Sequence, residues 1–269
     1  MNGNGYKAEL KEALRALRLP VFAAEHAATG AVAANESWTF DRFLLELCQL
    51  ELARREEHRR QKLLASSRLP REKTLLSFER ARLRRSADAQ FAALLTGEFL
   101  TRSENVLVFG PPGSGKTHLL CALGLELIGH GKSVLFSSCV LLVQRLLLAK
   151  NELWLEKELK RLDRFEALII DDLGYVQQSR EEMEVLFTLL AHRYERRSVL
   201  LTSNLVFSEW ERIFKDPLTT AAAIDRLVHH SVILELNLPS YRMEAAKLQQ
   251  SKNDDENGSP TLAAAGIEN

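Results

Sequence analysis

The pattern of apolar and polar positions divides the chain into three parts. Residues 1–85 carry apolar residues at helical spacing, which predicts an all-helical N-terminal domain. Residues 86–248 alternate between short apolar runs and helical patterns, which is typical of buried strands separated by helices. Residues 249–269 are polar and lack periodicity, which favours a disordered tail.

Two helices stand out in the N-terminal part. In the first, Leu10, Leu14 and Leu17 fall on one face. The second is predicted from Thr39, a suitable N-cap residue, to about Leu64. Its second half, ARREEHRRQK, is charged on every side, so this end is expected to project into solvent or onto a ligand. The apolar residues expected to be buried in its first half are Phe40, Phe43, Leu44, Leu47 and Cys48.

Five short apolar runs in residues 86–248 predict β-strands. Because these runs are nearly continuous in apolar residues and are separated by amphipathic segments, we expect a central five-stranded parallel sheet covered by helices on both faces, an α/β fold. The predicted strands are Asn105–Phe109, Ser133–Ser137, Ala167–Ile170, Val199–Ser203 and Val232–Leu234.

The sequence GPPGSGKT, directly after the first predicted strand, matches the pattern G-x-x-x-x-G-K-[ST] of phosphate-binding loops. Glycines let the backbone wrap closely around an anion, and the following helix adds the positive end of its dipole. Lys116 is expected to contact the β- and γ-phosphates, and Thr117 to offer its hydroxyl to Mg²⁺. The candidate nucleotide-binding residues here are Gly110, Pro111, Pro112, Gly113, Ser114, Gly115, Lys116, Thr117 and His118, the last without a separate role.

Two further predicted strands end in polar residues. ALIIDDLG delivers Asp171, a candidate Mg²⁺ ligand, and Asp172, a candidate general base for the attacking water. SVLLTSN delivers Asn204, a candidate for orienting that water and sensing the γ-phosphate. Taken alone, the same residues are equally typical of a solvated Asp-Asp turn and of a turn or capping Asn.

Charge is balanced overall but not locally. Lys plus Arg and Asp plus Glu both number 36, yet residues 54–85 hold 12 Lys and Arg against 4 Glu, a net charge of +8. Such a segment suits the phosphates of a nucleic acid, with affinity that weakens steeply with salt. The alternative is a solvated helix with its charge balanced by Glu56 and Glu57. The candidate DNA-binding residues are Arg54, Arg55, Arg59, Arg60, Arg80, Arg82, Arg84 and Arg85.

Other features favour a cytoplasmic protein. The three cysteines are scattered, as expected for reduced thiols. The chain has no signal-peptide pattern and no apolar run long enough to cross a membrane. The adjacent His229 and His230 are expected to point in different directions with no partner ligand nearby, so we interpret them as structural.

Together these motifs resemble those of the AAA+ ATPases. GPPGSGKT looks like Walker A, LIIDDLG like Walker B and LLTSN like the sensor-1 strand, with 55 residues from Lys116 to Asp171 and 33 more to Asn204. AAAIDRLVHHSVILELNLPSYR is similar to the box VII segment of the DnaC/IstB clade, with Arg226 in the arginine-finger position. The stretches LRLP, FLLELCQLELARRE and RLPREKTLLSF extend the likeness to the IstB family over about residues 8–247.

This resemblance implies an AAA+ P-loop core that binds ATP and Mg²⁺ and hydrolyses ATP. The chain departs from the typical AAA+ module in one respect: about 35 residues follow the last predicted strand, and about 20 of them look disordered, which is too few for a full C-terminal lid. The resemblance also implies a helper of insertion-sequence transposition, which assembles with ATP on duplex target DNA and recruits the cognate transposase. Arg226 would act on the nucleotide of a neighbouring subunit. Arg242 would stand in for a sensor-2 arginine, the alternative being a surface arginine. Asp172 replaces the Glu found in many AAA+ proteins, which would suit slow turnover.

Two other functions remain open from the sequence. A DnaC-like helicase loader would use the same ATPase machinery but favour single-stranded DNA. A small-molecule P-loop kinase or a nucleotide-regulated binding module would share only the phosphate loop, and the sequence shows neither the acceptor pocket nor the substrate lid that a kinase needs.

Overall fold

The computed structural model describes residues 3–174, 179–214 and 216–241, and the chain divides into two compact units, Met1–Ser66 and Ser67–Asn269. The boundary lies after residue 66 instead of the predicted residue 85. Residues beyond it pack with the second unit: Leu69 lies against Gly124, and Phe78 stacks on His118 with 5.4 Å between ring centroids. The predicted tail, 249–269, lies outside the described residues.

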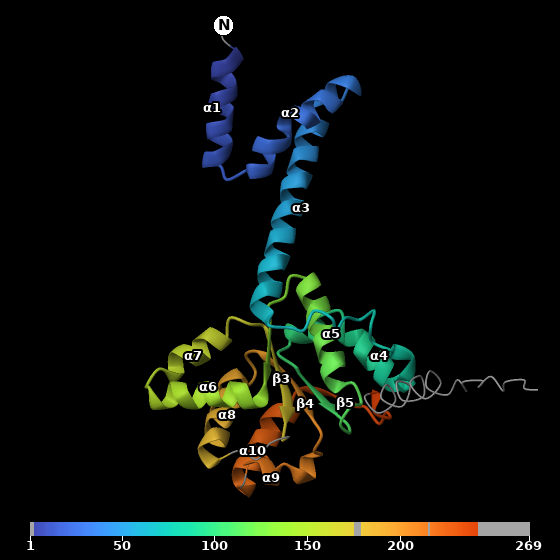
Figure 1. The fold of residues 1–269 in the computed structure, drawn as a ribbon, viewed down its shortest axis with the longest axis vertical. Coiled ribbons are helices and arrows are strands. Elements are labelled where there is room, and N and C mark those ends of the chain that lie inside the picture. Colours follow the sequence, from blue (N-terminus) through green and yellow to red (C-terminus); the bar gives the residue numbers. More distant parts are fainter. Residues whose placement is uncertain (1–2, 175–178, 215, 242–269) are drawn as a thin grey trace, which may run out of the picture. The chain divides into compact units, whose positions relative to one another are not determined.

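The described part of the first unit consists of three helices, α1 (Gly3–Ala16), α2 (Pro20–Asn35) and α3 (Phe40–Ser67) (Figure 1). Thr39 caps α3 as expected, since its Oγ1 accepts a hydrogen bond from the backbone N–H of Arg42 at 3.3 Å.

Burial in the first unit is less complete than its apolar pattern predicts. Leu14 and Leu47 are buried, but Leu17, Phe40 and Leu44 are exposed. A unit of three helices offers too little neighbouring surface to cover the whole apolar face of α3.

The expectation of helix throughout residues 1–85 is wrong for residues 68–79, which form an irregular loop before the short 3-10 turn at 80–82. Pro70 has no backbone N–H to continue a helix. The Ser77 hydroxyl then donates hydrogen bonds to nearby backbone carbonyls, those of Glu72 (2.9 Å) and Thr74 (3.1 Å). Such side-chain bonds compete with helix formation.

The second unit is built on a five-stranded sheet of order β2-β3-β4-β1-β5, in which every pair is parallel. The five strands confirm the predicted α/β fold. They are β1 (Asn105–Phe109), β2 (Val134–Ser138), β3 (Ala167–Leu173), β4 (Ser198–Ser203) and β5 (Ser231–Glu235). The described helices of the unit are α4 (Arg85–Leu94), α5 (Lys116–Gly129), α6 (Cys139–Asn151), α7 (Leu155–Leu162), α8 (Arg180–Arg193), α9 (Glu211–Phe214) and α10 (Pro217–Val228), with 3-10 turns η1 (Arg80–Arg82), η2 (Glu98–Leu100) and η3 (Phe207–Glu209).

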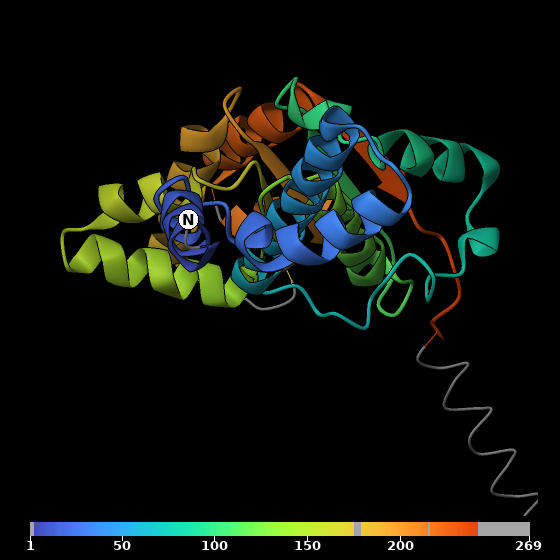
Figure 2. The ribbon, with the colours of Figure 1, turned by 90° about the horizontal axis from the view of Figure 1, so that it is seen from above.

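Helices cover both faces of the sheet (Figures 1 and 2). Successive strand residues point to opposite faces, so Leu168 and Ile170 join the core formed with α6, α8 and α10. Ile169, between them, points the other way and meets α5 at Gly124. This double covering explains why the strands are apolar along their whole length.

The described helices include none with the length and apolar character needed to span a bilayer.

We predict that Arg193 is a structural arginine of the second unit. Its side chain is fully buried, and its guanidinium donates to the carbonyls of Leu162 (3.0 Å) and Ser198 (3.0 Å). Burial lowers the pKa of Arg193 to about 10. Arg193→Leu leaves these carbonyls unsatisfied, so the free energy of unfolding should fall by about 3 kcal/mol or more in urea titrations. The exposed neighbour Arg197 provides the control: Arg197→Leu should change it by less than about 0.5 kcal/mol, and equal losses would contradict the prediction.

Candidate functional site

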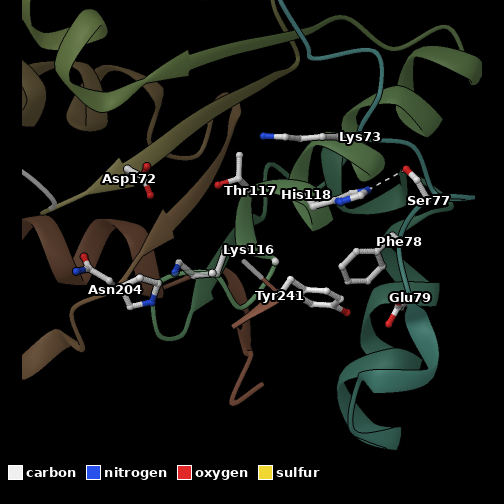
Figure 3. A pocket seen from close by; sticks show the side chains of 13 residues that line it. Lys73, Ser77, Phe78, Glu79, Lys116, Thr117, His118, Asp172, Asn204 and Tyr241 are labelled. Atoms are coloured by element: carbon white, nitrogen blue, oxygen red, sulfur yellow. Dashed lines mark hydrogen bonds between the residues drawn. The ribbon is translucent and has the colours of Figure 1, made fainter. Parts of the chain in front are cut away.

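A pocket of about 450 Å³ opens where the loops after β1, β3 and β4 meet. In parallel sheets these carboxyl ends lie at one edge, where α/β proteins bind ligands. Lys116, Thr117, Asp172 and Asn204 line the pocket together, although they come from three different strand ends (Figure 3). The structure therefore brings together the residues that the three sequence motifs singled out.

The backbone of the phosphate loop leaves room for an anion. Gly113 and Gly115 have φ values of 80° and 94°, which favour glycine, and a side chain on Gly113 would collide with Ser240. Helix α5 begins at Lys116, so the N–H groups of its first turn face the loop. The hydroxyl of Ser114 is buried without a hydrogen-bond partner among the described residues. This donor set fits the phosphates of a nucleotide.

Lys116 is held against the same loop. Its Nζ donates to the carbonyl oxygens of Gly110 (2.8 Å) and Pro111 (3.0 Å), and the residue is 6 % exposed. Phosphate oxygens carry charge and accept stronger hydrogen bonds than neutral carbonyls do. The amine can thus exchange these partners for phosphate.

Asp171 is the centre of a small hydrogen-bond cluster at the ends of β3 and β4 and the start of α5. Its Oδ1 accepts hydrogen bonds from Thr117 Oγ1 (2.9 Å) and Thr202 Oγ1 (2.7 Å). Burial raises the pKa of Asp171, and the nearby charge of Asp172 raises it further, while the two hydroxyls oppose the shift. A divalent cation would favour the carboxylate form, and Thr117 and Asp171 offer the oxygen ligands that Mg²⁺ prefers.

Asp172 is directed into the pocket by a β-bulge. Ile170 pairs with Leu201 and Leu173 with Ser203, so β3 has one residue more than β4 over this interval. Asp172 adopts φ = 61°, which is uncommon for a residue other than glycine, and it is exposed although its strand is buried. The bulge thus places a carboxylate in the pocket beside the buried Asp171.

Thr202 is a site residue that the sequence analysis missed. Besides donating to Asp171, its Oγ1 accepts a hydrogen bond from the backbone N–H of Asp172 at 2.8 Å. The sequence did hold a signal for it, because Thr202 belongs to the polar run that ends β4, but only Asn204 of that run was predicted as a site residue. Lys73, Phe78 and Tyr241 also line the pocket and were not predicted.

His118 lies between the phosphate loop and the loop of residues 68–79. It lines the pocket, but its Nε2 lies 3.1 Å from the carbonyl oxygen of Thr74 and 3.2 Å from Ser77 Oγ. A carbonyl can only accept, so Nε2 carries the proton and donates. His118 therefore fastens the loop of residues 68–79 to the first turn of α5.

Arg226 lies at the opposite end of β1 from the phosphate loop. Asn105, the first residue of β1, donates through Nδ2 to the carbonyls of Arg226 (3.4 Å) and Leu227 (3.1 Å). The strand separates its two ends by about 13 Å. The half-buried Arg226 side chain points along α10, donating to the carbonyl of Ala222 at 3.0 Å, and does not line the pocket. Arg242 lies outside the described residues.

Comparison with known proteins supplies the family. A family model described as IstB-like ATP binding protein matches residues 12–249. The chain belongs to this family. A relative from Sinorhizobium fredii, named as an insertion sequence ATP-binding protein, is 44% identical over 241 residues, covering 89% of this chain and 81% of its own. Another, named for insertion sequence IS5376 of Geobacillus stearothermophilus, is 36% identical over 250 residues, covering 93% and 100%.

Solved structures support the AAA+ fold of this IstB-like ATP-binding protein. AMPPCP-bound DnaA from Aquifex aeolicus matches with a TM-score of 0.53 at 19% identity, covering 69% of this chain and 57% of that chain. At this identity the likeness shows the fold alone. Family membership identifies ATP as the ligand of the chain.

The basic residues predicted on α3 of the IstB-like chain differ in their surroundings. Arg54 and Arg59 are exposed. Arg55 pairs with Glu51 at 2.8 Å, and Arg60 with Glu57 at 2.9 Å. The second ion pair matches the alternative of a helix with internally balanced charge.

The second basic cluster is more strongly tied into its own unit. Arg80 pairs with Asp88 at 2.8 Å, and Arg82 stacks on the ring of Tyr241 with 3.8 Å to its centroid. Arg84 and Arg85, at the start of α4, are exposed. Arg80 is thus paired with α4 and Arg82 packs on a residue that lines the pocket, which leaves Arg84 and Arg85 as the exposed cations of this cluster.

The expectation that His229 and His230 have no partner ligand nearby is wrong, because Glu195 Oε1 lies 4.0 Å from His229 Nδ1 and 3.9 Å from His230 Nε2. All three residues are exposed. His229 Nδ1 is already hydrogen-bonded to the Tyr194 hydroxyl at 2.9 Å, so we keep the structural interpretation.

We predict that Thr202→Val weakens Mg²⁺-dependent ATP binding at least tenfold. The substitution keeps the shape of the side chain but removes both of its hydrogen bonds, to the Asp171 carboxyl and from the backbone N–H of Asp172. Fluorescence titration with labelled ATP, with and without Mg²⁺, measures the change. Thr202→Ser, which retains the hydroxyl, should stay within about threefold of wild type; a Val variant that binds Mg²⁺-ATP normally would contradict the prediction.

Proposed function

We propose that this IstB-like protein hydrolyses ATP to ADP and phosphate and serves as an ATP-dependent DNA-binding helper of insertion-sequence transposition. The observation that carries the ATPase proposal is the convergence of Lys116, Thr117, Asp172 and Asn204 on one pocket beside the buried Asp171. Phosphoryl transfer depends mainly on positioning and on electrostatic stabilisation, and this set supplies both.

Each residue has a role that its surroundings support. Lys116 and the loop N–H groups would bind the phosphates. Thr117 and Asp171 would hold Mg²⁺, which supplies positive charge to the phosphate oxygens. Asp172, exposed in the pocket, would accept the proton of the attacking water, and Asn204 would orient that water.

The aromatic end of the pocket suits the base of the nucleotide. Phe78 and Tyr241 lie beside each other there, away from Asp172 and Asn204 (Figure 3). Tyr241 is fixed to the phosphate loop, because its backbone N–H donates to the carbonyl of Gly113 at 3.0 Å. The rings would contact adenine while the loop holds the phosphates.

Arg226 supports assembly of several copies. Because it is anchored at the far end of β1, it cannot serve the nucleotide of its own chain. An arginine finger supplied by a neighbour requires a head-to-tail contact, which forms rings if it closes and helical filaments if it does not.

Two observations support DNA and a transposase as the partners. Relatives in the family are named for insertion sequences. On α3, Arg55, Arg59 and Lys62 line one shallow hollow of the surface, a basic face suited to backbone phosphates. We therefore propose duplex DNA and a cognate transposase as partners, in the cytoplasm.

We predict that the purified protein forms large assemblies on duplex DNA only with Mg²⁺-ATP, because nucleotide would bridge neighbouring subunits. Sedimentation with duplex or single-stranded DNA, and with free phosphate release measured in parallel, tests this. Lys116→Ala should abolish assembly and phosphate release, and assembly should weaken steeply as salt rises.

Other outcomes of that experiment assign other functions. Assembly on single strands alone would favour a helicase loader. Transfer of phosphate to a metabolite, without free phosphate, would identify a kinase. Duplex assembly that is unchanged in Lys116→Ala would refute control by nucleotide.

We predict that Arg226→Ala retains ATP binding but loses turnover about 1000-fold or more, the usual effect of removing an arginine finger. Mixing this variant with Lys116→Ala should restore part of the activity, because each variant supplies what the other lacks. The control is Arg212→Ala on α9, an exposed arginine that pairs with Glu209, and this variant should keep its activity. Unchanged hydrolysis in Arg226→Ala, or a mixture that stays inactive, would rule out a finger acting across subunits.

A further inference from the structure

Residues 72–79, here called the 72–79 loop, form the wall of the pocket opposite the phosphate loop. The loop is internally rigid. Ser77 Oγ donates to the carbonyls of Glu72 and Thr74, and Thr74 Oγ1 accepts from the backbone N–H of Ser77 at 3.3 Å. A wall tied together in this way can present a side chain in a defined position.

The 72–79 loop is also fastened to the element that carries the phosphate site. His118, one residue after Thr117, donates to the Thr74 carbonyl at 3.1 Å and stacks on Phe78. Phe78 is in turn buried against Phe91 of α4, with 6.0 Å between ring centroids. The first turn of α5 and the 72–79 loop therefore keep a fixed spacing across the pocket.

Lys73 projects from this loop into the pocket. It is half-buried, and it lies near Thr117, on the side of the pocket away from Phe78 and Tyr241 (Figure 3). Its positive charge acts on the buried carboxyl of Asp171, where it opposes the rise in pKa. Within the described residues, its amine makes neither an ion pair nor a hydrogen bond. A cation held there by a rigid loop faces the place where the groups for Mg²⁺ and water gather.

We propose that Lys73 is a further phosphate-contacting residue, whose ammonium binds the γ-phosphate of ATP from the wall opposite Lys116. The inference rests on the proposed nucleotide site. Lys73 is matched to the γ-phosphate because it lies on the side of the pocket that holds Thr117 and Asp171, whereas the aromatic end is suited to the base. ADP lacks this group, so Lys73 makes the site distinguish ATP from ADP.

The position of Lys73 in the sequence gives this contact a second consequence. It is seven residues beyond Ser66, where the first unit ends. The segment that touches the γ-phosphate is thus also the segment that continues into α3, which carries the basic face. Chain continuity thus connects the proposed γ-phosphate contact to the unit proposed to bind DNA.

The test compares the affinities of the full chain for two ligands, Mg²⁺-ADP and the non-hydrolysable analogue β,γ-methylene-ATP. Calorimetric titration of Lys73→Ala should show at least tenfold weaker binding of the analogue, with ADP affinity within threefold of wild type. Lys73→Arg should restore most of the analogue affinity. Arg71→Ala is the matched control. It removes an exposed charge two residues before Lys73 and outside the pocket, so it should leave both affinities unchanged.

Loss of affinity for both ligands in Lys73→Ala, or for neither, would overturn the inference, since the first indicates a structural role and the second no contact. Lys73→Gln, of similar length, is measured alongside, and thermal unfolding identifies any variant that fails to fold. The test is separable from ATP hydrolysis. A wild-type chain that prefers the analogue through Lys73 but releases no phosphate would retain this inference and refute the proposed ATPase.

Discussion

One buried carboxylate oxygen connects the elements of the site. Asp171 Oδ1 accepts hydrogen bonds from Thr117, at the start of α5, and from Thr202, at the end of β4. A carboxyl buried this deeply must be compensated, because desolvation penalises its charge. The two hydroxyls supply part of that compensation and at the same time fix the phosphate helix to the two central strands. The same Thr202 Oγ1 accepts from the backbone N–H of Asp172, so this arrangement also positions the second carboxylate of the site.

Features that depend on local pattern could be predicted from the sequence. The apolar runs gave all five strands to within a few residues, because strands covered on both faces must be apolar along their length. The parallel order then places the ends of β1, β3 and β4 at one edge, so Lys116, Thr117, Asp172 and Asn204 meet. The N-cap of α3 at Thr39 is also a local signal.

Features that depend on contacts distant in sequence could not be predicted. The bulge at Asp172 exists only through the pairing of β3 with β4, and Thr202 matters only because that pairing brings it to Asp171. Residues 68–79 fell within the part predicted to be helical, but local Ser77 hydrogen bonds and the distant His118 hold them as a loop. The domain boundary was misplaced for the same reason, since packing against α5 decides where residues 67–85 belong.

The fixed place of Arg226 has a consequence for how activity depends on copy number. Its backbone is fastened to Asn105 at the amino end of β1, and a strand cannot shorten to bring it to the pocket. If Arg226 is an arginine finger, an isolated subunit hydrolyses no ATP, however tightly it binds the nucleotide. Specific activity would then rise with protein concentration instead of remaining constant. A few scattered copies would then hold ATP without hydrolysing it until they gathered at one place, which would make local concentration the trigger.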